Sequence, residues 1–278
     1  MKEKIIEKIL MILAFSAIGL LLLITVFIFR EGLPVILKSG LPDFLFSAKW
    51  APTKGRFGIL SMIISSLAVT FNAILLGVPL ALACAITLAE FTPHRWVVVL
   101  KPTIELLAGI PSVVFGFLGV IFLVPLIREY LGGPGLSLLA ASIILAIMIL
   151  PTITSISIDA LQAVPLLYKE GALAMGATHW QAIRYVLLPA ARSGVVTAII
   201  LGMARAIGET MAVIMVAGNA LKIPGSVLDP VRTLTSTIAL EMGYSTGDHR
   251  QALFAAGIIL FVFIMGLNIL ATTLMRRK

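Results

Sequence analysis

Charged residues are scarce in this chain. Only 12% of its 278 residues are Asp, Glu, Lys or Arg, whereas 60% are hydrophobic and the mean hydropathy is +1.10. A soluble domain of this length would need many more polar side chains to cover its surface. The composition therefore excludes an ordinary soluble domain and indicates that membrane lipid surrounds most of the chain.

A basic stripe with interleaved aromatic residues is also missing, although the net charge is +8. Domains that bind nucleic acid gather Lys and Arg on one face or along one helix. Here the basic residues stand in the polar segments between apolar runs, as they do in the loops of membrane proteins. We therefore expect no nucleic-acid partner.

Metal ligands and thiols are few. Cys84 is the single cysteine and lies in an apolar run, so it cannot form an intrachain disulfide and is expected to be a buried, inert thiol. The three histidines, His94, His179 and His249, are far apart and accompany no H-E-x-x-H or paired-cysteine motif. We expect neither a metal nor a cofactor bound by this chain.

The sequence G-x-x-x-x-G-K-[ST] does not occur. Backbone N–H groups of that loop hold the phosphates of ATP in many nucleotide hydrolases. An ATP-driven process that involves this chain would therefore need a second protein to hydrolyse the nucleotide.

Long apolar runs are what the sequence has in abundance. A membrane-spanning helix requires about 20 apolar residues. Six runs are candidates for such helices: 9–29, 57–89, 106–127, 130–158, 193–216 and 251–275. They predict an all-α, polytopic membrane protein with six transmembrane helices.

Turn-forming residues subdivide these runs. Pro79 predicts a bend in the second run, residues 109–112 interrupt the start of the third, and the Gly-Gly-Pro-Gly turn at 132–135 opens the fourth. Residues 231–244 predict a short helix that does not cross the membrane. Six crossings place both termini on one side, and the basic clusters at the two ends favour the cytoplasm, among them residues 276–278.

The polar segment between the fourth and fifth runs is predicted to leave the membrane. Pro165 can begin a helix because its missing N–H would have no partner in the first turn. Gly176 permits a sharp change of direction after a helix at 168–175, and Thr178 can cap a second helix at 179–188. Two short helices joined at a glycine form a compact knob that fits a groove on a soluble partner.

Two opposite charges stand within the fifth apolar run. Arg205 and Glu209 are four residues apart, so they are predicted to share one face of a helix. Ionisable residues inside a span usually face the helix bundle or a water-filled path. Two interpretations remain open: an internal salt bridge, or a pathway in which the planar guanidinium of Arg205 binds an anion.

A carboxylate in an anion pathway favours an anion that carries an O–H group. Phosphate keeps at least one proton near neutral pH, whereas sulfate has none. Glu209 can therefore accept a hydrogen bond from phosphate but meets only a lone pair on sulfate. Thr210 either donates a hydrogen bond to the same substrate or satisfies neighbouring backbone groups.

The polar loop resembles the coupling loop of the permease subunits of ABC importers. That loop has the form E-A-A, three residues, G, nine residues, I, one residue, L-P. This chain keeps every spacing, with glycine for the first alanine and valine for isoleucine, in residues Glu170, Gly171, Ala172, Gly176, Val186, Leu188 and Pro189. The resemblance implies that the loop docks on a cytoplasmic ATPase.

The charged run adds a more specific likeness. Residues 202–213, G-M-A-R-A-I-G-E-T-M-A-V, resemble the corresponding span of phosphate importer permeases of the PstC type, as do residues 109–116, 146–151 and 217–219. The likeness covers about residues 60–278. It implies that Arg205, Glu209 and Thr210 line the substrate pathway.

The resemblance also implies a domain plan and the MetI-like fold of ABC importer permeases. Residues 1–56 then form the first transmembrane helix and an extracytoplasmic connection. Residues 57–278 form the core permease domain, with the cytoplasmic coupling loop at about 159–192. The expected location is a prokaryotic cell (inner) membrane, with cytoplasmic termini.

Three kinds of partner follow from the same resemblance. A second, PstA-like permease would complete the pore, two copies of a PstB-like ATPase would bind ATP and Mg, and an extracytoplasmic PstS-like protein would deliver phosphate. This chain would then be a transport subunit and not an enzyme.

Alternative functions remain at this stage. Sulfate, molybdate or phosphonate are the alternative substrates of an ABC importer. An ion-driven carrier or channel is an alternative mechanism, although it would not need the spaced coupling loop. A membrane-embedded enzyme would need a nucleophile–base set or a metal cluster, and the spans offer only Arg205 and Glu209.

Overall fold

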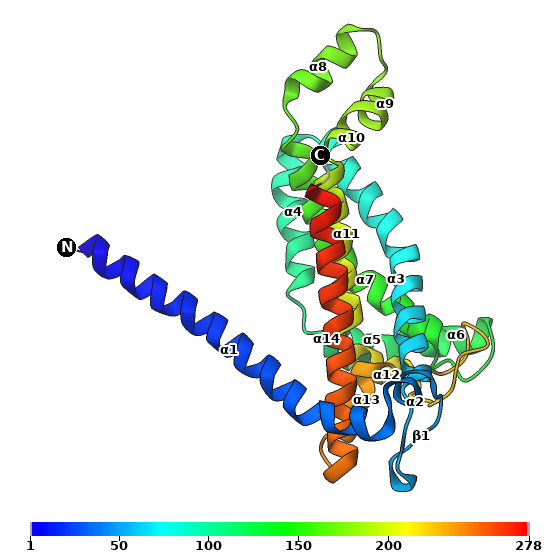
Figure 1. Ribbon diagram of the computed structural model, residues 1–278. Helices are drawn as coiled ribbons and strands as arrows, with labels where there is room; N and C mark the ends of the chain where they lie inside the picture. Colours follow the sequence, from blue (N-terminus) through cyan, green and yellow to red (C-terminus); the bar gives the residue numbers. More distant parts are fainter. Residues whose placement is uncertain (1, 277–278) are drawn as a thin grey trace. The chain divides into compact units, whose positions relative to one another are not determined.

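The computed structural model describes residues 2–276, and helices make up most of it (Figure 1). The chain forms two compact units. One comprises the chain up to Leu60 together with Thr237–Val262, and the other comprises Ser61–Ser236 and the segment that begins at Phe263. Residues 277 and 278 of the predicted basic C-terminal cluster lie outside the described residues.

The first unit combines the two ends of the sequence. Its elements are α1 (Lys2–Ser39), α2 (Leu41–Phe46), strands β1 (Trp50–Ala51) and β2 (Arg56–Phe57) around the short helix η1 (Pro52–Lys54), the end of α13 (Leu234–Glu241) and most of α14 (Gly247–Arg276). Trp50 pairs with Phe57 across the antiparallel strands. Phe27 of α1 meets Phe254 of α14 edge to face, with 5.5 Å between ring centroids.

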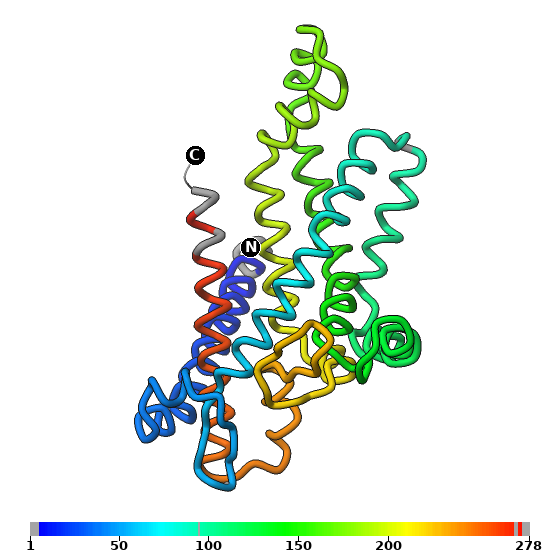
Figure 2. Tube along the Cα trace, turned by 90° about the vertical axis from the view of Figure 1, so that its right-hand side faces the viewer, coloured from blue at the N-terminus to red at the C-terminus, as the bar shows by residue number. Residues whose placement is uncertain are grey.

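The second unit contains the remaining helices. In chain order they are α3 (Leu60–Ile86), η2 (Thr87–Phe91), α4 (His94–Ala108), α5 (Ser112–Leu118), η3 (Gly119–Leu123), α6 (Val124–Tyr130), α7 (Leu138–Gln162), α8 (Leu166–Ala174), α9 (His179–Ala182), η4 (Ile183–Leu187), α10 (Leu188–Ala190), α11 (Arg192–Gly208) and α12 (Met211–Val216). The segments η2, η3 and η4 are π-helical. Figure 2 shows the chain between α7 and α11 projecting beyond the ends of both helices.

Helix α7 lies at the centre of the second unit, between α4 and α11. Most of its side chains are apolar and 15 of its residues are buried, which is the pattern of a helix inside a bundle. Ile149 and Ile153 of α7 are fully buried, as is Ala198 of α11. Ser137 begins the helix, since its hydroxyl accepts a hydrogen bond from the Ala140 N–H at 3.2 Å.

Within residues 2–276, five helices are long and apolar enough to cross a membrane, or six if one bent pair of helices is counted as a single span. The five segments are Ile6–Ser39, Leu60–Phe91, Ser112–Tyr130, Leu138–Gln162 and Gly247–Ile269. The bent pair is His179–Ala190 and Arg192–Gly208, at 71° to each other. The prediction of an all-α protein with up to six spans is therefore confirmed.

The boundaries differ from the predicted runs most clearly around the third and fourth spans. The third and fourth spans begin at Ser112 and Leu138, later than predicted, and α4 was not expected. Helix α4 carries charges that reduce its mean hydropathy, and two of these charges have partners on α7. Lys101 forms an ion pair with Asp159, and the Ser155 hydroxyl donates to Glu105 at 2.8 Å.

Candidate translocation site and coupling loop

The fifth apolar run is not one continuous helix. Helix α11 ends at Gly208, Glu209 is extended with φ −67° and ψ 132°, and α12 begins at Met211. The prediction that Arg205 and Glu209 share one face of a helix is therefore wrong. The carboxylate belongs to the break between two helices because Glu209 leaves the helical conformation.

Hydrogen bonds hold Glu209 at this break. Its carboxylate Oε1 accepts from the Ala212 N–H at 3.2 Å and so satisfies a free donor at the start of α12. Its backbone carbonyl accepts from the Thr235 hydroxyl at 2.9 Å. Glu209 is thus positioned by both its side chain and its main chain, while it stays half-buried.

Arg205 contacts a different helix. Its Nη2 donates to the backbone carbonyl of Ala108 at 3.3 Å. Ala108 is the last residue of α4, where carbonyl groups lack helical partners and a cation is favourable. Within residues 2–276, no ion pair joins Arg205 to Glu209. The structure therefore does not contain the internal salt bridge that was one of the two interpretations.

Two interrupted helices adjoin the charged residues. The chain is non-helical at 109–111, between α4 and α5, and again at 209–210, between α11 and α12. The following segments pack closely, since a Cβ atom on Gly116 of α5 would lie 3.0 Å from the Cα atom of Ala212. Irregular backbone within a membrane occurs where protein or a water-filled cavity surrounds it, and broken helices often form transport sites.

The Thr210 hydroxyl serves the backbone. It donates to the Gly208 carbonyl at 3.2 Å, across the break. Asn219 acts in the same way, because its amide nitrogen donates to the Ile214 carbonyl at 2.7 Å. In the structure Thr210 therefore satisfies a neighbouring backbone group, which is one of its two predicted roles. Its other predicted role, a hydrogen bond to the substrate, remains a proposal that its half-buried position beside Glu209 supports.

The predicted knob is present. Helix α8 follows Pro165, Gly176 has a φ of 86° in the left-handed region that favours glycine, and α9 begins after Thr178. Thr178 accepts from the Gln181 N–H at 3.3 Å, while the Gln181 side chain accepts from the Thr178 N–H at 2.8 Å. This reciprocal capping box explains why the second helix begins at His179.

The motif residues of this loop differ in exposure. Ala172, Val186 and Leu188 are half-buried within the knob. The remaining four, Glu170, Gly171, Gly176 and Pro189, are exposed. Large apolar side chains are exposed beside them, including Leu167, Met175 and Trp180. Such a patch at the end of a membrane bundle is typical of a surface that binds another protein.

One carboxylate of the second unit was missed by sequence reasoning. Glu90, at the end of η2, accepts from Lys169 Nζ at 2.6 Å and lies 3.2 Å from His179 Nε2. Its position just after an apolar run was the only signal in the sequence. Lys169 and His179 lie far from Glu90 along the chain, so no local pattern predicts these contacts.

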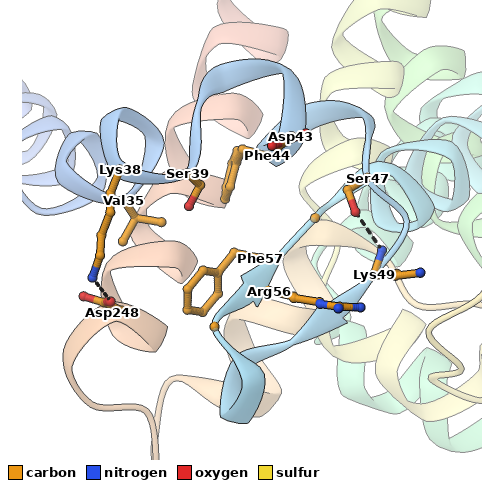
Figure 3. A pocket seen from close by; sticks show the side chains of 12 residues that line it. Val35, Lys38, Ser39, Asp43, Phe44, Ser47, Lys49, Arg56, Phe57 and Asp248 are labelled. Carbon is orange, nitrogen blue, oxygen red and sulfur yellow. Dashed lines mark hydrogen bonds and ion pairs between the residues drawn. The ribbon is translucent and has the colours of Figure 1, made fainter.

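The first unit contains a second set of polar residues that the sequence did not predict. The Trp50 indole N–H donates to Glu241 Oε2 at 2.9 Å, and His249 Nε2 lies 2.8 Å from the same oxygen. Beside them is a pocket of about 610 Å³ whose lining includes Lys49, Arg56 and Phe57 (Figure 3).

Comparison with known proteins places this arrangement in a family. Residues 77–278 match the family described as "Binding-protein-dependent transport system inner membrane component". This chain belongs to that family. The permease also shares 46% identity over 266 residues with the "Probable ABC transporter permease protein YqgH" of Bacillus subtilis (strain 168), covering 92% of this chain and 85% of that protein.

Other relatives carry a more specific name. The "Phosphate transport system permease protein PstC" of Mesorhizobium japonicum is 39% identical over 241 residues, covering 79% of the permease and 74% of the relative. The protein of the same name in Xylella fastidiosa (strain 9a5c) is 34% identical over 258 residues, covering 84% of the permease and 79% of the relative.

Solved structures confirm the MetI-like fold. The inward-facing MetNI methionine ABC transporter matches with a TM-score of 0.63 and 21% identity, over 82% of the permease and 98% of the matched chain. A bacterial ABC transporter that imports alginate matches with a TM-score of 0.64 and 17% identity, over 96% and 95%. With the family match and the apolar spans, the protein is a multi-pass membrane permease of the ABC importer type.

Proposed function

We propose that this permease is the PstC-type subunit of an ATP-driven phosphate importer. With a second, PstA-like permease it forms the inward path for inorganic phosphate. The observation that carries the proposal is the pair of half-buried charges, Arg205 and Glu209, at a helix break in an otherwise apolar run. Relatives named as phosphate transport permeases, at 34% and 39% identity, support the choice of substrate.

Arg205 supplies the attraction for the anion. Its guanidinium has five N–H donors, and the contact with the Ala108 carbonyl uses only the Nη2 group. The remaining donors can bind two oxygens of an oxyanion in a forked geometry. A second cation from the PstA-like permease would add to the attraction, because Glu209 offsets the charge of Arg205.

Glu209 supplies the discrimination between oxyanions. Oε1 is engaged by Ala212, whereas Oε2 accepts no hydrogen bond from the described residues. Phosphate can donate its O–H group to that oxygen, and sulfate cannot. Thr210 stands next in sequence and can turn its hydroxyl from the Gly208 carbonyl to the substrate.

Energy for the transport comes from a separate protein. The exposed knob of α8 and α9 is the surface on which two copies of a PstB-like ATPase, with ATP and Mg, act on the pore. The knob and the chain termini face the cytoplasm of a prokaryote in this assignment. A PstS-like protein delivers phosphate at the opposite face.

Uptake by vesicles that contain the complete complex tests this function. Labelled phosphate and labelled sulfate are supplied with and without ATP to the native complex and to Arg205→Ala. We expect ATP-dependent phosphate uptake by the native complex and a decrease of roughly tenfold or more in the variant, the loss of charge-assisted hydrogen bonds worth about 1.5–3 kcal/mol. Arg95→Ala is the matched control, because Arg95 is exposed in the first turn of α4, outside both the site and the coupling loop.

Two outcomes would contradict the proposal. ATP-dependent uptake of sulfate without uptake of phosphate would assign the permease to another oxyanion. Uptake of phosphate that does not require ATP would assign it to the carriers or channels.

A further inference from the structure

We propose that Glu90 is a positioning residue that fastens both arms of the coupling loop to the end of α3. Movement of the loop is thereby transmitted to this span. The inference rests on the proposed function, because it concerns how work done on the loop reaches the pore. Here the coupling loop means residues 165–190, from the residue before α8 to the end of α10.

One oxygen of Glu90 binds both arms. Oε2 accepts a hydrogen bond from Lys169 Nζ of α8 at 2.6 Å and lies 3.2 Å from Nε2 of His179, the first residue of α9. The Phe91 ring packs against the His179 imidazole, with 5.0 Å between the centroids. Two consecutive residues at the end of η2 thus contact the loop on both sides of its turn.

Burial strengthens this contact. The Glu90 side chain is 9% exposed and that of Lys169 is 24% exposed. Salt screens charge pairs much less at such positions than at the surface. Removal of one partner would leave the remaining charge partly buried and uncompensated, which is strongly destabilising in a buried pair.

Apolar packing holds the first arm of the loop only weakly. Helix α8 buries no residue, and its side chains Leu166, Leu167 and Tyr168 are exposed. At the base of the loop lies a hollow of about 260 Å³, lined mainly by small residues such as Ala160, Ala163, Ala190, Ala191 and Gly194. The loop can therefore tilt about its base. The contact with Glu90 determines whether α3 moves together with the loop.

The π-helical turn at the end of α3 explains how Glu90 reaches the loop. Residues Thr87–Phe91 form η2, in which each turn contains an extra residue. One residue corresponds to a rotation of about 100° around an α-helix, so a regular helix would direct this carboxylate elsewhere. Single π-helical turns of this kind are frequent at functional sites.

The coupling ratio of the complete complex tests the inference. Phosphate uptake and ATP hydrolysis are measured together in proteoliposomes for the native complex and for Glu90→Gln, which keeps the size of the side chain and removes its charge. We expect uptake per ATP hydrolysed to fall roughly tenfold, as for the loss of about 1.4 kcal/mol of coupling. Glu105→Gln is the matched control, because that carboxylate accepts from Ser155 outside the loop and should leave the ratio unchanged.

A charge exchange separates positioning from general stability. Glu90→Lys alone should reduce the coupling ratio, and the double variant Glu90→Lys with Lys169→Glu should recover at least half of the native ratio because the pair forms again with reversed charges. A native-like ratio in Glu90→Gln, or no recovery in the double variant, would overturn the inference.

A second measurement does not depend on transport. A nitroxide label at Met175→Cys, in a chain with Cys84→Ala, reports the mobility of the exposed tip of the loop. We expect Glu90→Gln to increase that mobility in the folded complex, and unchanged mobility would overturn the inference. If the native complex lacks ATP-dependent phosphate uptake while the label responds as expected, the proposed function fails and the attachment of the loop stands.

Discussion

Glu209 lies at the end of a helix where the sequence suggested a helix interior. Its carboxylate accepts a backbone N–H of α12, and its carbonyl accepts the Thr235 hydroxyl. These two contacts stabilise an extended residue between α11 and the short helix α12. A charged side chain can remain half-buried among apolar spans at such a position because backbone groups satisfy part of its hydrogen-bonding capacity.

Replacement of this carboxylate should change selectivity. Glu209→Gln keeps an oxygen that can accept from Ala212 and adds an N–H₂ donor. Sulfate can accept a hydrogen bond from that donor, so we expect the phosphate-over-sulfate preference to fall about tenfold, as for one hydrogen bond worth roughly 1–1.5 kcal/mol. Competition of sulfate against labelled phosphate uptake measures the preference.

The control for this change is another carboxylate. Glu105→Gln lies on α4 and should leave the preference at its native value. An unchanged preference in Glu209→Gln would contradict the assigned role of the carboxylate.

At the scale of elements, breaks between helices carry most of the functional features. Helices α4 and α11 both end beside the charged pair, and the π-helical turn η2 presents Glu90 to the coupling loop. Some breaks have a local cause, such as Pro111 before α5 and Gly176 after α8. Local sequence signals therefore predict the loop turn and the break before α5.

Loss of the capping box should loosen the second arm of the loop. Thr178→Ala removes the oxygen that accepts from the Gln181 N–H, at an expected cost of about 1 kcal/mol in the stability of α9. Hydrogen exchange of the amides in residues 179–187 should become several-fold faster. Thr178→Ser keeps the hydroxyl and should exchange as the native protein does, whereas equal rates in Thr178→Ala would argue against the cap.

Asp229 makes the stability of the connection after α12 depend on pH. Its pKa is held below the ordinary value of 3.8, first by Lys222 and then by the N–H groups of Gly225 and Ser226. A carboxylate with a lowered pKa in the folded state stabilises the fold above its ordinary pKa, and this stabilisation is lost as the pH falls through the lowered value.

A variant reveals this dependence. The thermal stability of Asp229→Asn, measured in detergent from pH 6 down to pH 3, should lie below that of the native protein at pH 6 and approach it as the pH falls. A difference between the two proteins that stays constant over this range would contradict the assignment. Lys222→Gln should give a smaller effect of the same sign.

At the scale of the whole molecule, the first unit joins residues from opposite ends of the chain. The Trp50 indole and Glu241 are 191 positions apart, yet the hydrogen bond between them is buried. His249 completes the group, with side chains of His249 and Glu241 that are 16% and 7% exposed. A buried carboxylate with two partners of this kind specifies how the early and late segments pack.

Removal of this carboxylate should destabilise the protein more than removal of an exposed one. Glu241→Ala leaves Trp50 and His249 without their shared acceptor and should cost roughly 3 kcal/mol in the free energy of unfolding. Asp248→Asn in the same unit removes only the exposed pair with Lys38 and should cost less than about 1 kcal/mol. Thermal unfolding in detergent compares them, and equal losses would show that the buried group adds no stability.

The sequence by itself determined most of the long helices, the number of apolar spans and the form of the coupling loop. Each of these depends on residues close together along the chain: apolar runs long enough to cross lipid, Thr178 with Gln181, and the conformational freedom of Gly176. The same local patterns identified Arg205 and Glu209 as unusual residues in an apolar run, and the spacing of the loop indicated its family.

Only the tertiary structure decided which side chains meet. Arg205 with Ala108, Glu90 with Lys169 and His179, and Trp50 with Glu241 are contacts between residues 79 to 191 positions apart. Their partners depend on how the helices pack and on where each helix breaks. The extra residue in the π-helical turn η2 changes the direction of the Glu90 side chain, and the extended conformation of Glu209 does the same for its carboxylate. Each change rotates the side chain by a large part of a helical turn. No repeating pattern in the sequence encodes these rotations.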